Sequence, residues 1–124
     1  MINGIIEEVY EIVRKERNRQ DIEYFEFHRN RYERMANQVS KTFDPSKTKI
    51  LEIGSHYLHS SIILKKLGFE IHAMDVNAFW DLDFVDRRKE QFGITKIVEN
   101  NLEQLTSVYG RKDEFDLILF TEIL

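Results

Sequence analysis

Residues that could bind a small ligand end two short apolar stretches in the second half of the chain. Glu52 and Gly54 end KILEIG, and Asp75 ends FEIHAMD, 21 positions after Gly54. A carboxylate can accept hydrogen bonds from both hydroxyls of a ribose, and a glycine permits the tight turn that brings backbone close to a ligand. An acid about twenty residues after such a turn is typical of nucleotide-binding folds. We therefore predict a nucleotide-type ligand at these positions.

Two later apolar stretches also end in residues that could contact a ligand. Asn100 and Asn101 follow ITKIVE, and Phe120, Thr121 and Glu122 follow FDLIL. In an open parallel sheet, ligands bind outside the carboxyl ends of the strands. We therefore expect all four ends to form one site along one edge of a sheet.

The elements that must position these ends follow from the hydrophobic pattern. Beyond Pro45, short β-branched stretches alternate with helical patterns, which indicates crossover connections and a parallel sheet. Before Pro45, apolar residues recur at helical spacing in two segments. The predicted fold class is α/β, with two amphipathic helices in residues 1–45 and a four-stranded, parallel Rossmann-like sheet in residues 46–124.

The second N-terminal helix, expected from about Asp21, carries an apolar and aromatic stripe. Its members are Tyr24, Phe25, His28, Tyr32, Met35, Ala36 and Val39. We expect this stripe to pack on the domain that follows; the alternative is an exposed surface for a partner, a substrate or self-association. Gly68, Gly93 and Gly110 stand where later helices should end, because glycine suits the left-handed C-cap conformation.

Composition narrows the functional classes. The chain has 124 residues, a formal net charge of −4 and no cysteine, which excludes disulfides and thiolate metal sites and favours a reducing compartment. Residues 50–124 hold eight Lys/Arg and thirteen Asp/Glu, so this half would repel a nucleic acid. The N-terminus lacks the basic start of a signal peptide, and no apolar run is long enough to span a membrane. We expect a cytoplasmic protein.

Taken together, the stretches resemble the class I S-adenosylmethionine-dependent methyltransferases over about residues 46–124. The family's first motif, an acid followed by alternating glycines, is similar to LEIGSHYL: Glu52 and Gly54 match, whereas His56 and Leu58 replace the later glycines. IHAMDV, VENNLEQL and FDLILFTEIL are similar to the second, third and fourth motifs.

This resemblance implies S-adenosylmethionine as the cofactor and a small-molecule methyl acceptor. It implies that Asp75 binds the ribose and that Asn101 lies beside the adenine. The cofactor contacts expected on this basis are Glu52, Gly54, Ser55, His56, Asp75, Val76, Asn77, Asn101, Leu102 and Phe120. Glu122 is the candidate general base, needed only if the acceptor must lose a proton. The family's complete domain has seven strands. We therefore expect the four strands predicted here to form a cofactor-binding half that is inactive alone.

The missing glycines suit S-adenosylmethionine better than a dinucleotide. A pyrophosphate needs bare backbone N–H groups and hence glycine. S-adenosylmethionine instead presents a sulfonium, an ammonium that Glu52 could accept from, and a carboxylate that His56 or the next helix N-terminus could bind. His56 and Leu58 should narrow the pocket. The alternatives are an NAD-type half-domain and a catalytically silent α/β module that docks another protein through its N-terminal helices.

Other polar residues are expected to be structural. His56 and His59 lack a third ligand, so no metal site is predicted, and His59 is expected on a helix surface. Arg87, Arg88 and Lys89 are expected on a solvated face, and Asp81, Asp83 and Asp86 at a helix N-terminus. Phe79 and Trp80 could flank the adenosine or pack in the core, and His72 should be buried in its strand.

Overall fold

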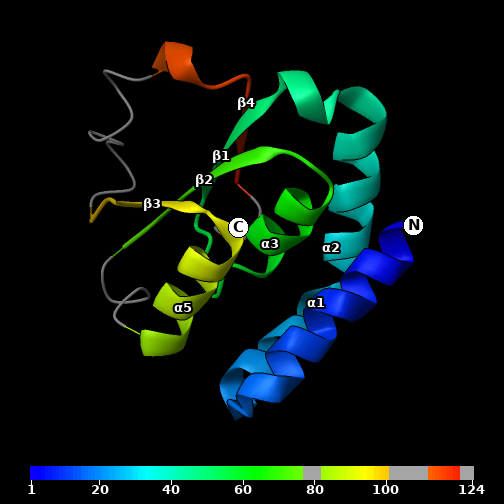
Figure 1. Cartoon of the computed structure of the whole chain (residues 1–124), viewed down its shortest axis with the longest axis vertical. Helices are drawn as coiled ribbons and strands as arrows, with labels where there is room; N and C mark the ends of the chain where they lie inside the picture. The colour runs from blue at the N-terminus through cyan, green and yellow to red at the C-terminus, as the bar shows by residue number, and fades with distance from the viewer. Residues whose placement is uncertain (77–81, 101–111, 121–124) are drawn as a thin grey trace.

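A computed structural model describes residues 1–76, 82–100 and 112–120 (Figure 1). The two N-terminal helices are followed by strands and helices in alternation, as the hydrophobic pattern predicts. The elements are α1 (Ile2–Glu16), α2 (Arg19–Thr42), a 3₁₀ turn (Pro45–Lys47), β1 (Lys49–Ile53), α3 (His59–Lys66), β2 (Glu70–Asp75), α5 (Asp83–Phe92), β3 (Thr95–Val98), a second 3₁₀ turn (Lys112–Glu114) and β4 (Leu117–Leu119).

The strands form one parallel sheet in the order β3-β2-β1-β4. Ile50 pairs with Ile71 of β2 on one side and with Leu117 of β4 on the other. The chain therefore builds outward from β1 to β3 and then returns to place β4 on the opposite side of β1. Strand order reverses between β1 and β4, and such a switch point is where open α/β sheets bind ligands. The predicted α/β class with a parallel Rossmann-like sheet is confirmed.

The two faces of the sheet are covered differently. Ile50, Ile71 and Ala73 face the larger core, which they share with the helices. Leu51 and Met74 belong to a smaller cluster on the opposite face, where Phe115 packs against them. This alternation follows from the period of two along each strand. It places Glu52, between Leu51 and Ile53, on the helix-facing side.

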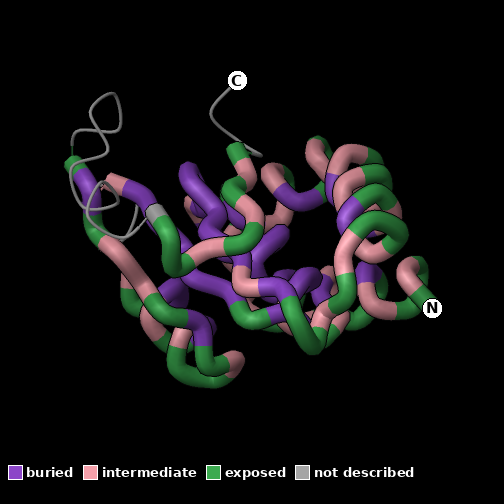
Figure 2. Tube along the Cα trace, turned by 90° about the horizontal axis from the view of Figure 1, so that it is seen from above, coloured by how far each residue is buried: buried purple, intermediate pink, exposed green. Residues whose placement is uncertain are grey.

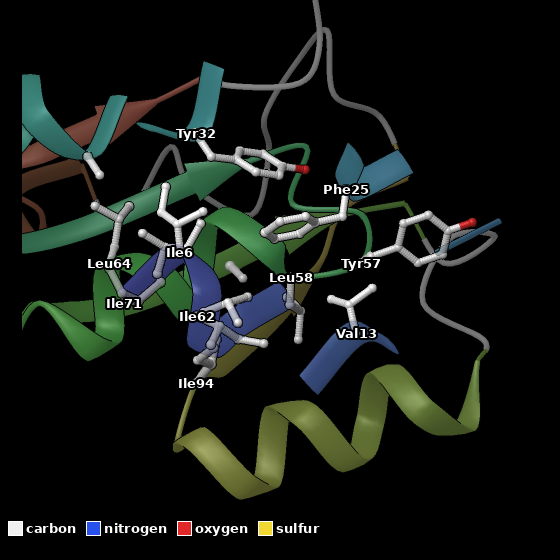
Figure 3. Packing of buried hydrophobic residues seen from close by; sticks show 14 of the residues in the cluster. Ile6, Val13, Phe25, Tyr32, Tyr57, Leu58, Ile62, Leu64, Ile71 and Ile94 are labelled. Carbon is white, nitrogen blue, oxygen red and sulfur yellow. The ribbon is translucent and has the colours of Figure 1, made fainter. Parts of the chain in front are cut away.

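The N-terminal helices pack together and against α3 (Figure 1). Arg17 takes a left-handed conformation after α1, and the side chain of Asn18 accepts from the N–H of Asp21 to cap α2. The buried residues of α2 include Phe25, Tyr32, Ala36 and Val39. Figure 2 shows the buried segments gathered inside the molecule, and Figure 3 shows Phe25 and Tyr32 in the same core as Leu58 and Ile62. The expectation that the stripe packs on the following domain is confirmed for these residues.

Glycines end two helices as predicted. Gly93 caps α5 with φ 65°, and Gly68 follows α3 with φ 102°, a conformation that other residues rarely adopt. Gly110 lies outside the described residues. None of the described helices is both long and apolar enough to cross a membrane.

Candidate functional site

The loop between β1 and α3 alternates between ordinary and left-handed backbone. Gly54, His56 and Leu58 have φ values of 80°, 47° and 69°. These are the three positions at which the methyltransferase motif has glycine. A left-handed conformation costs a non-glycine residue about 1–2 kcal/mol. The loop therefore keeps the backbone geometry of a glycine-rich turn although two of its three glycine positions carry side chains.

Backbone hydrogen bonds join this loop to the end of β2. The N–H groups of Gly54 and Ser55 donate to the carbonyl oxygen of Met74 at 2.8 and 3.2 Å. Ser55 is fully buried, and its hydroxyl donates to the carbonyl oxygen of Glu52 at 2.9 Å. Ser55 therefore contributes to the shape of the turn through its own polar groups.

Asp75, at the end of β2, supports the loop with its carboxylate. Oδ2 accepts from the N–H of His56 at 2.8 Å, and Oδ1 accepts from the N–H of Val76 at 2.7 Å. The side chain is only 2% exposed, and burial raises its pKa despite these bonds. Asp75 therefore holds His56 in its left-handed conformation. Its contact with a ribose stays a prediction.

Glu52 lies beneath the loop, on the side of β1 that faces α3. It is fully buried, and its Oε1 accepts from the hydroxyl of Ser61 at 2.7 Å. Glu52 thus connects the sheet to α3. The expected contact with a ligand ammonium is not tested by this arrangement.

The side chain of His56 joins the loop to α2. Its ring stacks on Tyr57 at 4.1 Å between centroids and meets Tyr24 edge-on at 4.8 Å. Burial is the main reason why the pKa of His56 lies below its usual value, so the imidazole is mainly neutral at pH 7. A neutral imidazole can still donate one hydrogen bond to a carboxylate. Part of the aromatic stripe of α2 therefore borders the predicted site.

The structure brings together the predicted residues of the first two strand ends. Gly54, Ser55, His56 and Asp75 are linked directly or through Met74, and half-buried Val76 follows Asp75. Phe120, which directly follows β4, is 47% exposed. Five other candidates lie outside the described residues, as do Phe79 and Trp80: Asn77, Asn101, Leu102, Thr121 and Glu122.

A second polar cluster, which we did not predict from the sequence, is buried where side chains of α2, α3 and α5 meet. We define the Asp21 cluster as Asp21, Tyr32, His59 and Arg88, all at most 4% exposed. Arg88 donates to both carboxylate oxygens of Asp21, with Nη1 at 2.9 Å from Oδ1. Arg88 also donates to the carbonyl oxygen of Tyr57 at 3.2 Å. The Asp21 cluster therefore links the N-terminal helices to the sheet domain.

Two predictions are wrong at this cluster. His59 was expected on a helix surface and Arg88 on a solvated face, but both are buried, His59 in α3 against α2 and Arg88 in α5 where it meets the carboxylate of Asp21. One sequence signal could have located Asp21 and Arg88, although not His59: Asp21 precedes Phe25 by four positions and Arg88 follows Phe84 by four, so each shares a helix face with an aromatic residue that is buried. Asp83 and Asp86 do lie in the first turn of α5, as predicted; Asp81 is outside the described residues.

The protonation states within the Asp21 cluster follow from its bonds. Burial favours a higher pKa for Asp21, but the bonds from Arg88 and His59 outweigh it and lower the pKa. Burial lowers the pKa of His59 to about 4, so this imidazole is neutral at pH 7. The ionised Asp21 can only accept, which assigns the proton of His59 to Nε2, 2.7 Å from Oδ1. Nδ1 then accepts from the hydroxyl of Tyr32 at 3.1 Å.

His72 is buried in β2 as expected and meets the ring of Phe115 at 5.2 Å. Within the described ranges, no group of three or more His, Asp or Glu side chains is arranged to hold a metal ion. No protein-family model matches the chain, and no curated protein is significantly similar to it. The resemblance to methyltransferases therefore depends on the motifs and on the geometry given above.

Proposed function

We propose that the chain binds S-adenosylmethionine at the carboxyl ends of β1 and β2 and forms the cofactor-binding part of a small-molecule methyltransferase. The observation that carries this proposal is the alternating left-handed backbone at Gly54, His56 and Leu58, next to the switch point between β1 and β4. A strained backbone at bulky residues is costly, and such strain is found preferentially at ligand sites.

Asp75 is the residue that we assign to the ribose. Each carboxylate oxygen has a second lone pair beyond the one that accepts from His56 or Val76. The two ribose hydroxyls would donate to these remaining positions. Because burial already raises the pKa of Asp75, two additional donors would stabilise its charged form.

The start of α3 would bind the carboxylate of the cofactor. No side chain caps this helix, which begins at His59 after left-handed Leu58. Its first N–H groups and the helix dipole favour an anion. When bound, S-adenosylmethionine supplies an already activated methyl group, so the protein has mainly to align donor and acceptor.

A second candidate is a catalytically silent α/β module that docks another protein. This candidate is favoured because both acidic site residues already have hydrogen-bond partners within the protein. Glu52 accepts from Ser61, Asp75 accepts from the loop backbone, and neither is more than 2% exposed. Such a module would use its N-terminal helices, where the side chain of Phe27 is 84% exposed.

Calorimetry with S-adenosylmethionine, S-adenosylhomocysteine, NAD and NADP separates these functions. We expect the first two to bind, and Asp75→Ala to weaken binding by roughly tenfold or more, since it removes hydrogen bonds to a charged acceptor. Asp83→Ala is the matched control, because Asp83 is exposed in the first turn of α5. Circular dichroism establishes whether each variant is folded. If Asp75→Ala is unfolded, Asp75→Asn takes its place in the binding measurement.

Three results would overturn the proposal. Unchanged affinity in a folded Asp75 variant would remove the site assignment. Binding of NAD or NADP in place of S-adenosylmethionine would favour an oxidoreductase half-domain. Absence of nucleotide binding, with concentration-dependent association in sedimentation, would favour the docking module.

A further inference from the structure

Arg31 of α2 presents buried hydrogen-bond donors that the described residues do not use. The residue is half-buried, and its Nε and Nη2 are shielded from solvent with no hydrogen-bond acceptor in the described part of the chain. Arg19 and Arg29 of the same helix, by contrast, each contact a carboxylate. Leaving donors of a charged group buried and unpaired is costly, and such groups require an explanation.

The two unpaired nitrogens share one edge of the guanidinium group. Nε–H and one N–H of Nη2 point in parallel along this edge. Arginine uses such an edge to hold a carboxylate or a phosphate through two parallel hydrogen bonds. The geometry therefore selects an anion with two oxygens on one atom over a neutral acceptor.

Arg31 belongs to the part of α2 that borders the candidate site. Tyr24, His28 and Arg31 follow each other at helical spacing on one side of α2. The ring of Tyr24 lies 4.3 Å from that of His28 and 4.8 Å from that of His56 in the loop. Burial is the main reason why the pKa of His28 is lowered, and the positive charge of Arg31 lowers it further.

We propose that Arg31 binds the carboxylate or phosphate group of the methyl acceptor, which is then a small organic anion. The identity of the anion as a methyl acceptor rests on the proposed methyl transfer, whereas the anion site itself does not. The proposed function assigns the cofactor carboxylate to a different position, the start of α3. Because both nitrogens are shielded from solvent, the anion must displace neighbouring side chains, and its oxygens then satisfy the unpaired donors.

The test measures binding of benzoate and phenyl phosphate to the full chain by titration followed with NMR. Benzamide, which is neutral and similar in shape to benzoate, is the ligand control. We expect both anions to bind and benzamide to bind at least roughly tenfold more weakly. Arg31→Gln should weaken the anions roughly 10- to 100-fold. Arg34→Gln, which removes the same charge from an exposed position of α2, should leave their affinity unchanged.

One further variant and a stability measurement distinguish other roles for Arg31. Arg31→Lys keeps the charge but lacks the paired N–H edge, so we expect it to restore only a small part of the affinity lost in Arg31→Gln. A purely structural role would lower the melting temperature of Arg31→Gln, whereas removal of an unpaired buried charge should leave that temperature unchanged or raise it.

The outcomes separate this inference from the proposed function. If Arg31→Gln weakens S-adenosylhomocysteine but not 5′-methylthioadenosine, which lacks the carboxylate, Arg31 binds the cofactor and our assignment is overturned. Failure of both anions to bind, or equal effects of Arg31→Gln and Arg34→Gln, also overturns it. If the anions bind through Arg31 while S-adenosylhomocysteine does not bind, the anion site stands and the proposed function fails.

Discussion

Asp21 and Asp75 are two of the buried carboxylates in the described part of the chain, and their surroundings differ in kind. Asp21 is fully buried between helices and contacts two side chains, Arg88 and His59. Asp75, at the carboxyl end of β2, accepts instead from backbone N–H groups. Burial raises the pKa of a carboxyl group in both places. At Asp21 the side-chain bonds outweigh burial and lower the pKa, whereas at Asp75 burial prevails and the pKa rises.

The difference indicates how the two regions divide their roles. A buried carboxylate that has a cation beside it already has its charge neutralised, and the ion pair holds the surrounding elements together. A buried charge held only by backbone dipoles would be stabilised by additional donors. The Asp21 cluster is thus suited to structure, and the edge near Asp75 is suited to a ligand. Four predictions test this comparison.

The largest effect is expected at the Asp21 cluster. Arg88→Met leaves the carboxylate of Asp21 buried without its cation and should lower the free energy of unfolding by about 3–5 kcal/mol. Urea unfolding at pH 7 measures this loss. The control is Arg87→Met, since the Arg87 side chain is 62% exposed and pairs with Glu16 at the surface. Its cost should be no more than about 1 kcal/mol. Similar losses in the two variants would show that Asp21 is not desolvated.

Acid should weaken the same cluster through protonation of His59. The pKa of His59 is about 4 in the folded protein and about 6.5 when unfolded. Between these values the unfolded chain binds the additional proton, so the free energy of unfolding falls as the pH falls from 6.5 towards 4. The stabilisation is fully present above pH 6.5. The difference corresponds to about 3 kcal/mol.

Urea unfolding at a series of pH values, with His59→Gln for comparison, isolates this contribution. The variant should show a shallower decline between pH 6.5 and 4. A residual decline is expected in the variant, because the pKa values of His28 and His56 are also lowered, chiefly by burial. An identical pH profile in both proteins would mean that His59 does not titrate with folding.

A smaller effect is expected when the two carboxylates are each replaced by an amide. Asp75→Asn should lower the free energy of unfolding by about 1 kcal/mol, because the lost hydrogen bond is partly offset by removal of a buried charge. Asp21→Asn should cost more, since it leaves Arg88 buried beside a neutral group. Parallel urea titrations at pH 7 make this comparison, and equal losses would contradict the division of roles.

The smallest effect is expected at His56 in the strained loop. His56→Gly should change the free energy of unfolding by no more than about 1 kcal/mol, because relief of the left-handed backbone offsets the lost ring contacts. Leu58→Gly relieves similar strain but also removes a side chain that is 1% exposed, so it should cost about 2 kcal/mol or more. Thermal unfolding of both variants tests this order. A large loss in His56→Gly would assign the ring a structural role.

The sequence predicted the scaffold of the candidate site better than its contacts. Gly54 and Asp75 were placed correctly at neighbouring strand ends, because each follows a stretch whose periodicity is local. The bonds of Asp75 to the loop backbone were not predicted. They depend on left-handed conformations at His56 and Leu58, which no residue preference would indicate.

What the sequence determined by itself is the order and type of the described elements: parallel strands between helices, a turn at Gly54 and helix ends near Gly68 and Gly93. These features depend on periodicity and backbone freedom within a few residues. Only the tertiary structure brought Asp21 to His59, 38 positions away, and to Arg88, 67 positions away. A polar residue is predicted to be exposed from its type alone, whereas its burial depends on residues far away in the sequence. Here the arrangement of α2, α3 and α5 decides which partners Asp21 meets.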